Sequence, residues 1–180
     1  MGAPMRLDKR VRGQANLEAS AQKTQYLAFD LNGEAFAMDI RCIKEVIQYG
    51  ALTAVPLMPD FIRGVINLRG AVVPVVDLSV RFGRTPTDVA RRTCVVILEV
   101  PSEGGTVELG ILVDNVSEVL DIAEADIEPA PAFGSALRSE FIAGVGKVGG
   151  RFVILLDVAH VLSIEEMTAL ASSCAPTEIG

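Results

Sequence analysis

The chain has 180 residues, enough to bury one sizeable core or two closely packed subdomains. Its composition is 50% hydrophobic with only 5% aromatic residues and no Trp, which predicts a core of Val, Ile, Leu and Ala. The formal net charge of −7 disfavours polyanions, so we expect no nucleic-acid partner.

The cysteine spacing and the hydropathy indicate the cellular compartment of the protein. Cys42, Cys94 and Cys174 are far apart and fit neither a disulfide framework nor a zinc site, so we expect reduced thiols in the cytoplasm. No apolar run approaches the roughly 20 residues of a membrane-spanning helix, and we therefore expect no direct membrane insertion.

The chain divides into three parts by composition. Residues 1–23 are polar and small with no sustained period, which predicts a disordered N-terminal arm. Residues 24–172 carry the strand patterns and form the predicted folded domain. Residues 173–180 are expected to be a flexible C-terminus.

The folded part begins with a predicted hairpin, because two apolar runs at 26–31 and 34–38 flank Asn32-Gly33. A helical turn near Ile40 follows and is expected to lead into one strand that runs toward residues 52–55, before Pro56 and Pro59 break the chain. Later strands are predicted at 93–100, 107–113 and 115–122. Ser163 and Glu166 match a capping box, which predicts a C-terminal helix to about Ala171.

The most informative stretch lies at 61–83, where two apolar runs flank Arg69-Gly70, and it recurs 80 residues later at 141–163. A glycine in the turn can take a positive φ, so both copies are predicted to be tight hairpins. A weaker echo at an offset of 73 matches Glu45 with Glu118 and Pro56 with Pro129. The chain is thus predicted to contain two copies of one β unit. The recurring positions are Phe61/Phe141, Ile62/Ile142, Gly64/Gly144, Val65/Val145, Gly70/Gly150, Val73/Val153 and Asp77/Asp157.

Several residues and motifs are of types found in catalytic or ligand-binding sites, but none predicts catalysis. Residues 144–149 match GxGxxG, but a strand pattern follows where a dinucleotide site needs a helix. His160 follows Asp157, but no nucleophile accompanies the pair, and a surface or packing role is expected. Asp77 and Asp157 are each expected to cap a short helix. We expect no cofactor and no metal, because no His, Cys and carboxylate cluster has ligand spacing.

Arg69 is the exception. It stands at a predicted hairpin tip between apolar strands, whereas the second copy has Gly149 there, so the fold itself does not require a cation. Arginine pairs bidentately with carboxylates, which suits an interface. Solvation at the tip is the ordinary alternative. The repetition of Glu45 as Glu118 favours a structural role, although an interface role remains open.

With these residues in view, the sequence resembles the CheW family of chemotaxis coupling proteins over about residues 24–170. The specific motifs are Gly64-Val65-Ile66-Asn67-Leu68-Arg69-Gly70 and Val73-Pro74-Val75-Val76-Asp77-Leu78. The resemblance implies an all-β fold with short helices: two intertwined five-stranded SH3-like β-barrels, related as pseudo-repeats, plus the C-terminal helix.

The same resemblance implies a non-catalytic adaptor that links the cytoplasmic tips of chemoreceptors to the regulatory domain of the histidine kinase CheA. It further implies a cytoplasmic protein that is recruited to membrane-associated receptor arrays. By position, receptor binding is expected at Ile43, Glu45 and Arg69, and kinase binding at Arg63, Gly64 and Gly70. The alternative from another class is a small-molecule-binding or enzymatic β-barrel.

Overall fold

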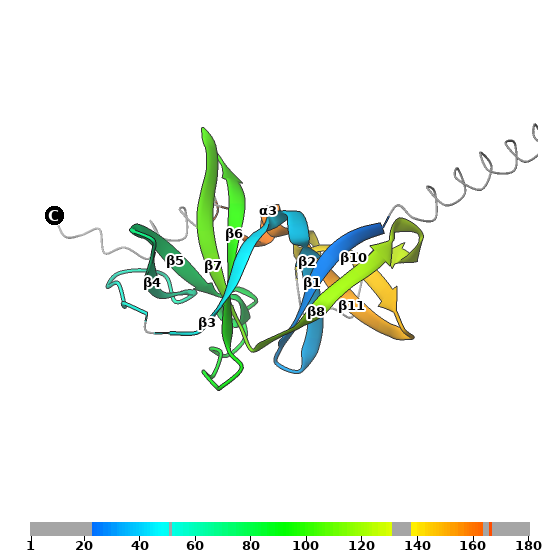
Figure 1. The fold of residues 1–180 in the computed structure, drawn as a ribbon, viewed down its shortest axis with the longest axis horizontal. Coiled ribbons are helices and arrows are strands. Elements are labelled where there is room, and N and C mark those ends of the chain that lie inside the picture. The colour runs from blue at the N-terminus through cyan, green and yellow to red at the C-terminus, as the bar shows by residue number, and fades with distance from the viewer. Residues whose placement is uncertain (1–22, 51, 131–137, 164–165, 167–180) are drawn as a thin grey trace, which may run out of the picture.

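The computed structural model describes residues 23–50, 52–130, 138–163 and 166. Two curled sheets lie side by side, and short helical segments lie between them (Figure 1). The sheet orders are β3-β6-β7-β5-β4 and β8-β1-β2-β11-β10-β9. Within the described residues no helix has the length and apolar character needed to cross a membrane. The predicted all-β class with short helices and SH3-like barrels is confirmed.

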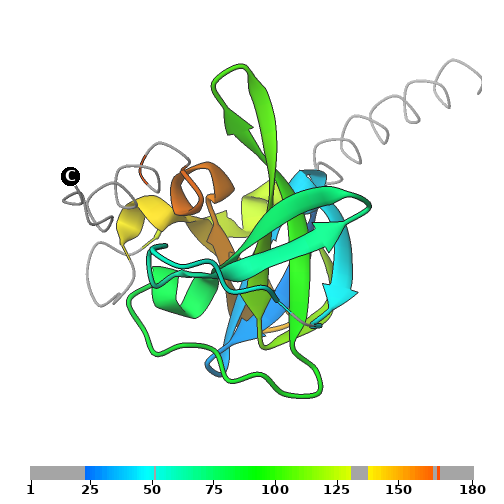
Figure 2. The ribbon, with the colours of Figure 1, turned by 90° about the vertical axis from the view of Figure 1, so that its left-hand side faces the viewer.

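The first barrel uses one contiguous part of the chain. Its strands run antiparallel except for β5 and β7, which pair in parallel. The β6–β7 hairpin extends beyond the rest of its sheet (Figure 2). The strands are β3 (Ile43–Gln48), β4 (Ile62–Leu68), β5 (Ala71–Asp77), β6 (Cys94–Ser102) and β7 (Gly105–Val113).

The second barrel takes strands from both ends of the chain, and this makes the barrels intertwined. The N-terminal hairpin joins the last strands through a parallel pairing of β2 with β11. The strands are β1 (Lys23–Leu31), β2 (Glu34–Asp39), β8 (Asn115–Ala123), β9 (Ile127–Glu128), β10 (Ile142–Val148) and β11 (Arg151–Leu156).

The second sheet has six strands where five were predicted. The sixth, β9, is only two residues long and pairs with Val145 and Gly146 of β10. In the first barrel the same place holds a single bridge between Thr53 and Val65, so the strand expected to run toward residues 52–55 ends earlier, at Gln48 of β3. Pro56 and Pro59 follow closely, and proline cannot donate to a strand ladder.

Short helical segments connect the strands. Asp77 caps α2 by accepting a bond from the Ser79 N–H, and Asp157 caps α3 by accepting one from the His160 N–H, as predicted. These segments are η1 (Ile40–Cys42), α2 (Leu78–Arg81), η2 (Glu124–Asp126), η3 (Ser139–Phe141) and α3 (Val158–Val161). The Ser163 hydroxyl accepts from the Glu166 N–H at 3.2 Å, which fits the capping box, while the predicted helix lies mostly outside the described residues. Residues 1–22 of the predicted N-terminal arm and the predicted C-terminus at 173–180 also lie outside them, while Lys23, the last residue of that arm, begins β1.

The repeat at offset 80 is confirmed by pairing. Both hairpins shift register at the same point, between Ile62 and Gly64 in one copy and between Ile142 and Gly144 in the other. The turns match as well: Arg69 and Gly70 have φ of 54° and 87°, and Gly149 and Gly150 have 57° and 78°.

The largest core lies between the barrels, because it draws buried residues from both sheets and from α2 and α3. Four phenylalanines form a chain of ring contacts through it, with centroids 5.6–6.1 Å apart. Each barrel interior adds a smaller cluster, one around Val73 and Val75 and the other around Val153 and Leu155. The ring chain consists of Phe29, Phe36, Phe82 and Phe141.

One buried arginine joins the two barrels. Arg81 of α2 donates from Nε to the carbonyl of Val161 in α3 at 2.8 Å. Its guanidinium lies 4.8 Å from the ring centroid of Phe141 and 5.7 Å from that of Phe61. These are cation–π contacts, which gain strength in a desolvated site. Arg81 therefore fixes how the two halves pack.

Candidate interaction site

The structure brings Arg69 and Glu45 together on the first barrel. Arg69 donates from Nη1 to Glu45 Oε1 at 2.6 Å and from Nη2 to Oε2 at 3.1 Å. The hydrogen bonds from Arg69 lower the pKa of Glu45. The Arg69 side chain is 73% exposed and that of Glu45 27%, so the pair presents a guanidinium to solvent.

The tight turn places this arginine. Arg69 and Gly70 both have positive φ, as a two-residue hairpin turn requires, and Asn67 Oδ1 accepts from the Gly70 N–H at 2.9 Å. A non-glycine residue is disfavoured in this region because Cβ crowds the backbone. Arg69 therefore carries a backbone strain that Gly149 avoids in the second copy.

Ile43 begins β3 two residues before Glu45, and the strand bulges between them. Its side chain is partly buried and packs against the central core. Of the three residues expected at a receptor face, the structure brings Glu45 and Arg69 together as a charged pair. Ile43 lies on the same strand as Glu45, beyond the bulge, and packs against the central core instead of joining that pair.

Arg63, Gly64 and Gly70, which are expected to bind the kinase, each also have a structural role in the first barrel. The Arg63 side chain turns toward Asp77, which it contacts through Nη1 at 2.7 Å. A Cβ on Gly64 would lie 2.6 Å from the carbonyl oxygen of Thr53, so only glycine fits there without movement. Gly70 supplies the second positive φ of the turn.

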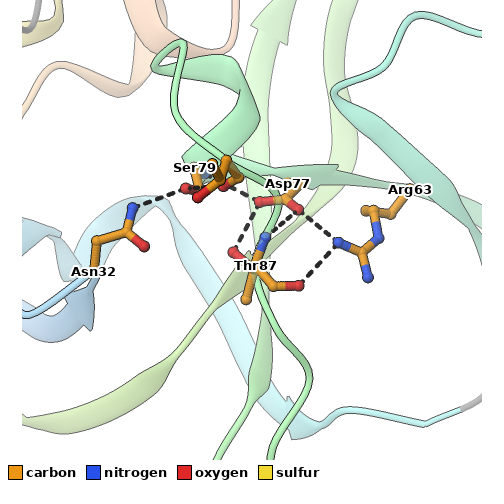
Figure 3. A network of polar contacts seen from close by, with 6 residues as sticks. Asn32, Arg63, Asp77, Ser79 and Thr87 are labelled. Atoms are coloured by element: carbon orange, nitrogen blue, oxygen red, sulfur yellow. Dashed lines mark hydrogen bonds and ion pairs between the residues drawn. The ribbon is translucent and has the colours of Figure 1, made fainter.

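A buried polar network surrounds Asp77 (Figure 3), and no pattern in the sequence predicted it. This fully buried carboxylate accepts from the Ser79 N–H and from the N–H and hydroxyl of Thr87, in addition to Arg63. The Asn32 amide donates to the Ser79 hydroxyl at 2.9 Å, which ties the N-terminal hairpin to the first barrel. Thr87 lies in a polar loop without periodicity, and only the three-dimensional fold identifies its partner.

The remaining candidates from the sequence are His160 and the glycines of residues 144–149. His160 contacts Asp157 through Nδ1 at 2.9 Å, and its side chain is 58% exposed. Residues 144–149 run along β10 into a hairpin turn, with no helix at the glycines. Among the described residues, no three His, Cys, Asp or Glu side chains gather in a way that could hold a metal ion.

Comparison with known proteins identifies the family. The family model described as CheW-like domain matches residues 25–166. The chain is 39% identical to the chemotaxis protein CheW of Klebsiella aerogenes over 143 residues, 79% of this chain and 84% of that one. It is 32% identical to CheW of Thermotoga maritima over 155 residues, 84% and 95% of the two chains.

A solved structure agrees with this result. The scaffolding protein TtCheW from Thermoanaerobacter tengcongensis superposes with a TM-score of 0.69 at 32% identity, covering 77% of this chain and 87% of that one. The family model, the sequence relatives and the fold thus lead to one conclusion. The chain belongs to the CheW family of chemotaxis scaffold proteins.

Proposed function

We propose that this protein is a non-catalytic adaptor that couples the cytoplasmic tips of chemoreceptors to the regulatory domain of the histidine kinase CheA. Family membership supports the role, and it suits a cytoplasmic protein recruited to receptor arrays at the membrane. Arg69 is the observation that carries the receptor contact. It occupies a strained backbone position where the repeat uses glycine, and strain of this kind is retained chiefly where function needs the side chain.

The receptor face in this proposal is the Glu45–Arg69 pair together with the start of β3 at Ile43. The kinase face is the region of β4 and its turn around Arg63, Gly64 and Gly70. Because Arg63 turns inward to Asp77, the backbone and neighbouring side chains of this hairpin make the kinase contact, and Arg63 holds their shape.

The test measures receptor-dependent stimulation of CheA together with direct affinity for CheA. Arg69→Glu places two carboxylates side by side and reverses the exposed charge, so we expect stimulation to fall about tenfold or more. Kinase affinity and the circular dichroism spectrum are expected to stay near wild type. Arg69→Gly is the matched variant without charge reversal, because Gly149 already builds the same turn.

Exchanging the charges of Glu45 and Arg69 distinguishes two roles for the pair: contact with a receptor, or stabilisation of the barrel alone. Glu45→Arg combined with Arg69→Glu restores the ion pair within the molecule but exchanges the two charges on its surface. We expect the exchanged protein to fold and still to couple poorly. Full recovery of coupling would show that the pair only braces the barrel, and failure of the wild type to stimulate CheA would refute the adaptor role itself.

A further inference from the structure

The two barrels can be compared strand by strand. The order β3-β6-β7-β5-β4 of the first matches β8-β1-β2-β11-β10 of the second. The β3–β6 and β8–β1 pairs share the same register shift, so Glu45 of the first barrel corresponds to Glu118 of the second. The matched pairings are Ile43↔Leu98 with Val116↔Phe29, and Glu45↔Ile97 with Glu118↔Ala28.

The first barrel closes the gap between its two edge strands with a cation. Arg69, from the β4–β5 turn, reaches Glu45 on β3. In the second barrel the carboxylate remains as Glu118, but the turn residue is Gly149. Both line a cavity of about 420 Å³. The place that the Arg69 side chain fills in one barrel is therefore open in the other.

The second barrel also lacks the counterpart of a second basic residue of the first barrel, Lys44. In the first barrel Lys44 pairs with Glu108 and lies 3.6 Å from Glu99. The corresponding residues of the second barrel are Ser117, Ala35 and Asp30, by the matched strand registers, and all three line the cavity. Asp30 accepts one bond, from the Asn115 amide at 3.2 Å.

The cavity thus keeps two carboxylates, Asp30 and Glu118, while both basic partners are replaced by small residues. Arg151 also lines it, but within the described part of the chain no ion pair joins Arg151 to either carboxylate. Leu120, Val148 and Val153 complete an apolar wall. Such a wall suits the methylene stem of a long basic side chain whose head reaches a carboxylate.

We propose that this cavity binds an arginine side chain presented by a partner protein. The guanidinium pairs with Glu118 as Arg69 pairs with Glu45, because a planar fork matches a carboxylate bidentately. Asp30 adds a second negative charge, and the apolar wall receives the stem. The first barrel supplies its own arginine, and the second takes one from outside.

The experiment titrates the full-length protein with acetyl-Gly-Arg-Gly-amide and follows backbone amide shifts by NMR. The same peptide with citrulline in place of Arg has nearly the same shape without the charge. We expect saturable shifts at Glu118, Gly149 and Val153 with the arginine peptide only. This titration contains neither receptor nor kinase, so its outcome is independent of the proposed adaptor role.

Three variants test the assignment. Glu118→Gln is expected to weaken binding about tenfold, as loss of a charge-assisted pair does. Asp121→Asn, on the same strand but outside the cavity, is expected to bind like wild type. Gly149→Arg places an arginine at a φ of 57°, close to the 54° of Arg69, and is expected to fill the cavity and abolish peptide binding.

Several results would overturn the proposal. These are the absence of saturable shifts, equal shifts with the citrulline peptide, or unchanged binding in a folded Glu118→Gln variant. Self-association of the wild type that Arg69→Gly removes would make a second copy of this chain the occupant, and would refute the assignment to a separate partner.

Discussion

Glycine at position 64 is required by the close approach of another segment, not by a turn. The backbone of Val65 exchanges two hydrogen bonds of 2.9 Å with Thr53, which brings the Thr53 carbonyl against Gly64. Gly144 plays the same part in the second copy, where a Cβ would lie 2.6 Å from Ile127 Cγ2 and 3.0 Å from the Glu128 carbonyl. The recurrence of this glycine therefore has a steric cause.

Gly64→Ala is expected to destabilise the protein by about 1–3 kcal/mol, because the methyl group forces the Thr53 segment away. Gly50→Ala is the control, since a Cβ at that position meets nothing within 4 Å. Urea unfolding of both variants measures the difference. Equal urea midpoints for the two variants would show that residues 52–55 move away from the added methyl group at no cost in stability.

Asp77 and Asp157 are equivalent caps in very different surroundings. Asp77 is fully buried with Arg63 and Thr87, whereas the Asp157 side chain is 34% exposed. Asp77→Asn removes the charge that compensates Arg63 and is expected to cost about 3 kcal/mol. Asp157→Asn is expected to cost about 1 kcal/mol or less, as a weakened cap does. Thermal unfolding monitored by circular dichroism compares the two, and similar losses would contradict the structural role of the network.

At the level of single elements, β5 and β11 form the inner wall of their barrels. Val73 is 1% exposed and Val153 5% exposed, each within its own barrel's smaller core cluster. Pro74 is tolerated in β5 because the pairing with β7 begins only at Val75. The strand can therefore be buried despite its proline.

Val73→Ala and Val153→Ala are each expected to destabilise the protein by about 1–3 kcal/mol, through lost burial and the cavity left behind. Val72→Ala, at a side chain 69% exposed, should change stability little. Denaturant midpoints that move equally for Val72 and Val73 would contradict the assignment of faces.

The sequence predicted these elements better than it predicted their contacts. The repeat at the offset of 80 was predicted correctly. Its glycines recur where another segment approaches the backbone closely, and its aspartates recur where they cap a short helix. At the offset of 73, Glu45 and Glu118 are equivalent, but Pro56 and Pro129 are not, because Thr53 faces Val65 whereas Glu128 faces Val145.

The candidate site was predicted only in part. Glu45 and Arg69 were each identified, yet nothing in their spacing indicated that they pair with each other. Barrel closure brings these residues together across 24 positions of sequence. The inward turn of Arg63 could not be predicted either. Besides contacting Asp77, Arg63 donates from Nη1 to the carbonyl of Thr87 at 3.1 Å, and Thr87 lies in a loop without periodicity.

At the scale of the whole molecule, charged contacts join Glu166 to arginines at the shared centre. Glu166 accepts from Arg138 Nη1 at 2.6 Å and lies 3.2 Å from Arg81 Nη2. The bond from Arg138 and the charge of Arg81 lower the pKa of Glu166 below its ordinary value of 4.5. The carboxylate thus bridges an arginine of the first barrel and one that precedes η3 of the second.

This pKa shift makes a pH-dependent contribution to stability. Because the folded pKa is depressed, the contribution is present above about pH 4.5 and is lost as the pH falls through the folded value. Glu166→Gln should therefore lower the unfolding midpoint at pH 7, by an amount worth at most about 1 kcal/mol for this partly exposed pair. The difference from wild type should shrink as the pH falls further below 4.5, and a difference that stays constant over that range would mean that the carboxylate charge is not responsible.

The division of the second barrel between the two ends of the chain affects its synthesis on the ribosome. The β1–β2 hairpin leaves the exit tunnel first, but its partners β8 and β11 follow only after the first barrel has been made. At about 5–20 residues per second, the 75 residues between Asp39 and Asn115 take roughly 4–15 s. Over that interval the strands of the first barrel emerge one after another, with β7 ending at Val113 just before β8 begins. The hairpin meanwhile exposes unpaired strand edges, the kind of surface that recruits chaperones or pairs with a neighbouring nascent chain.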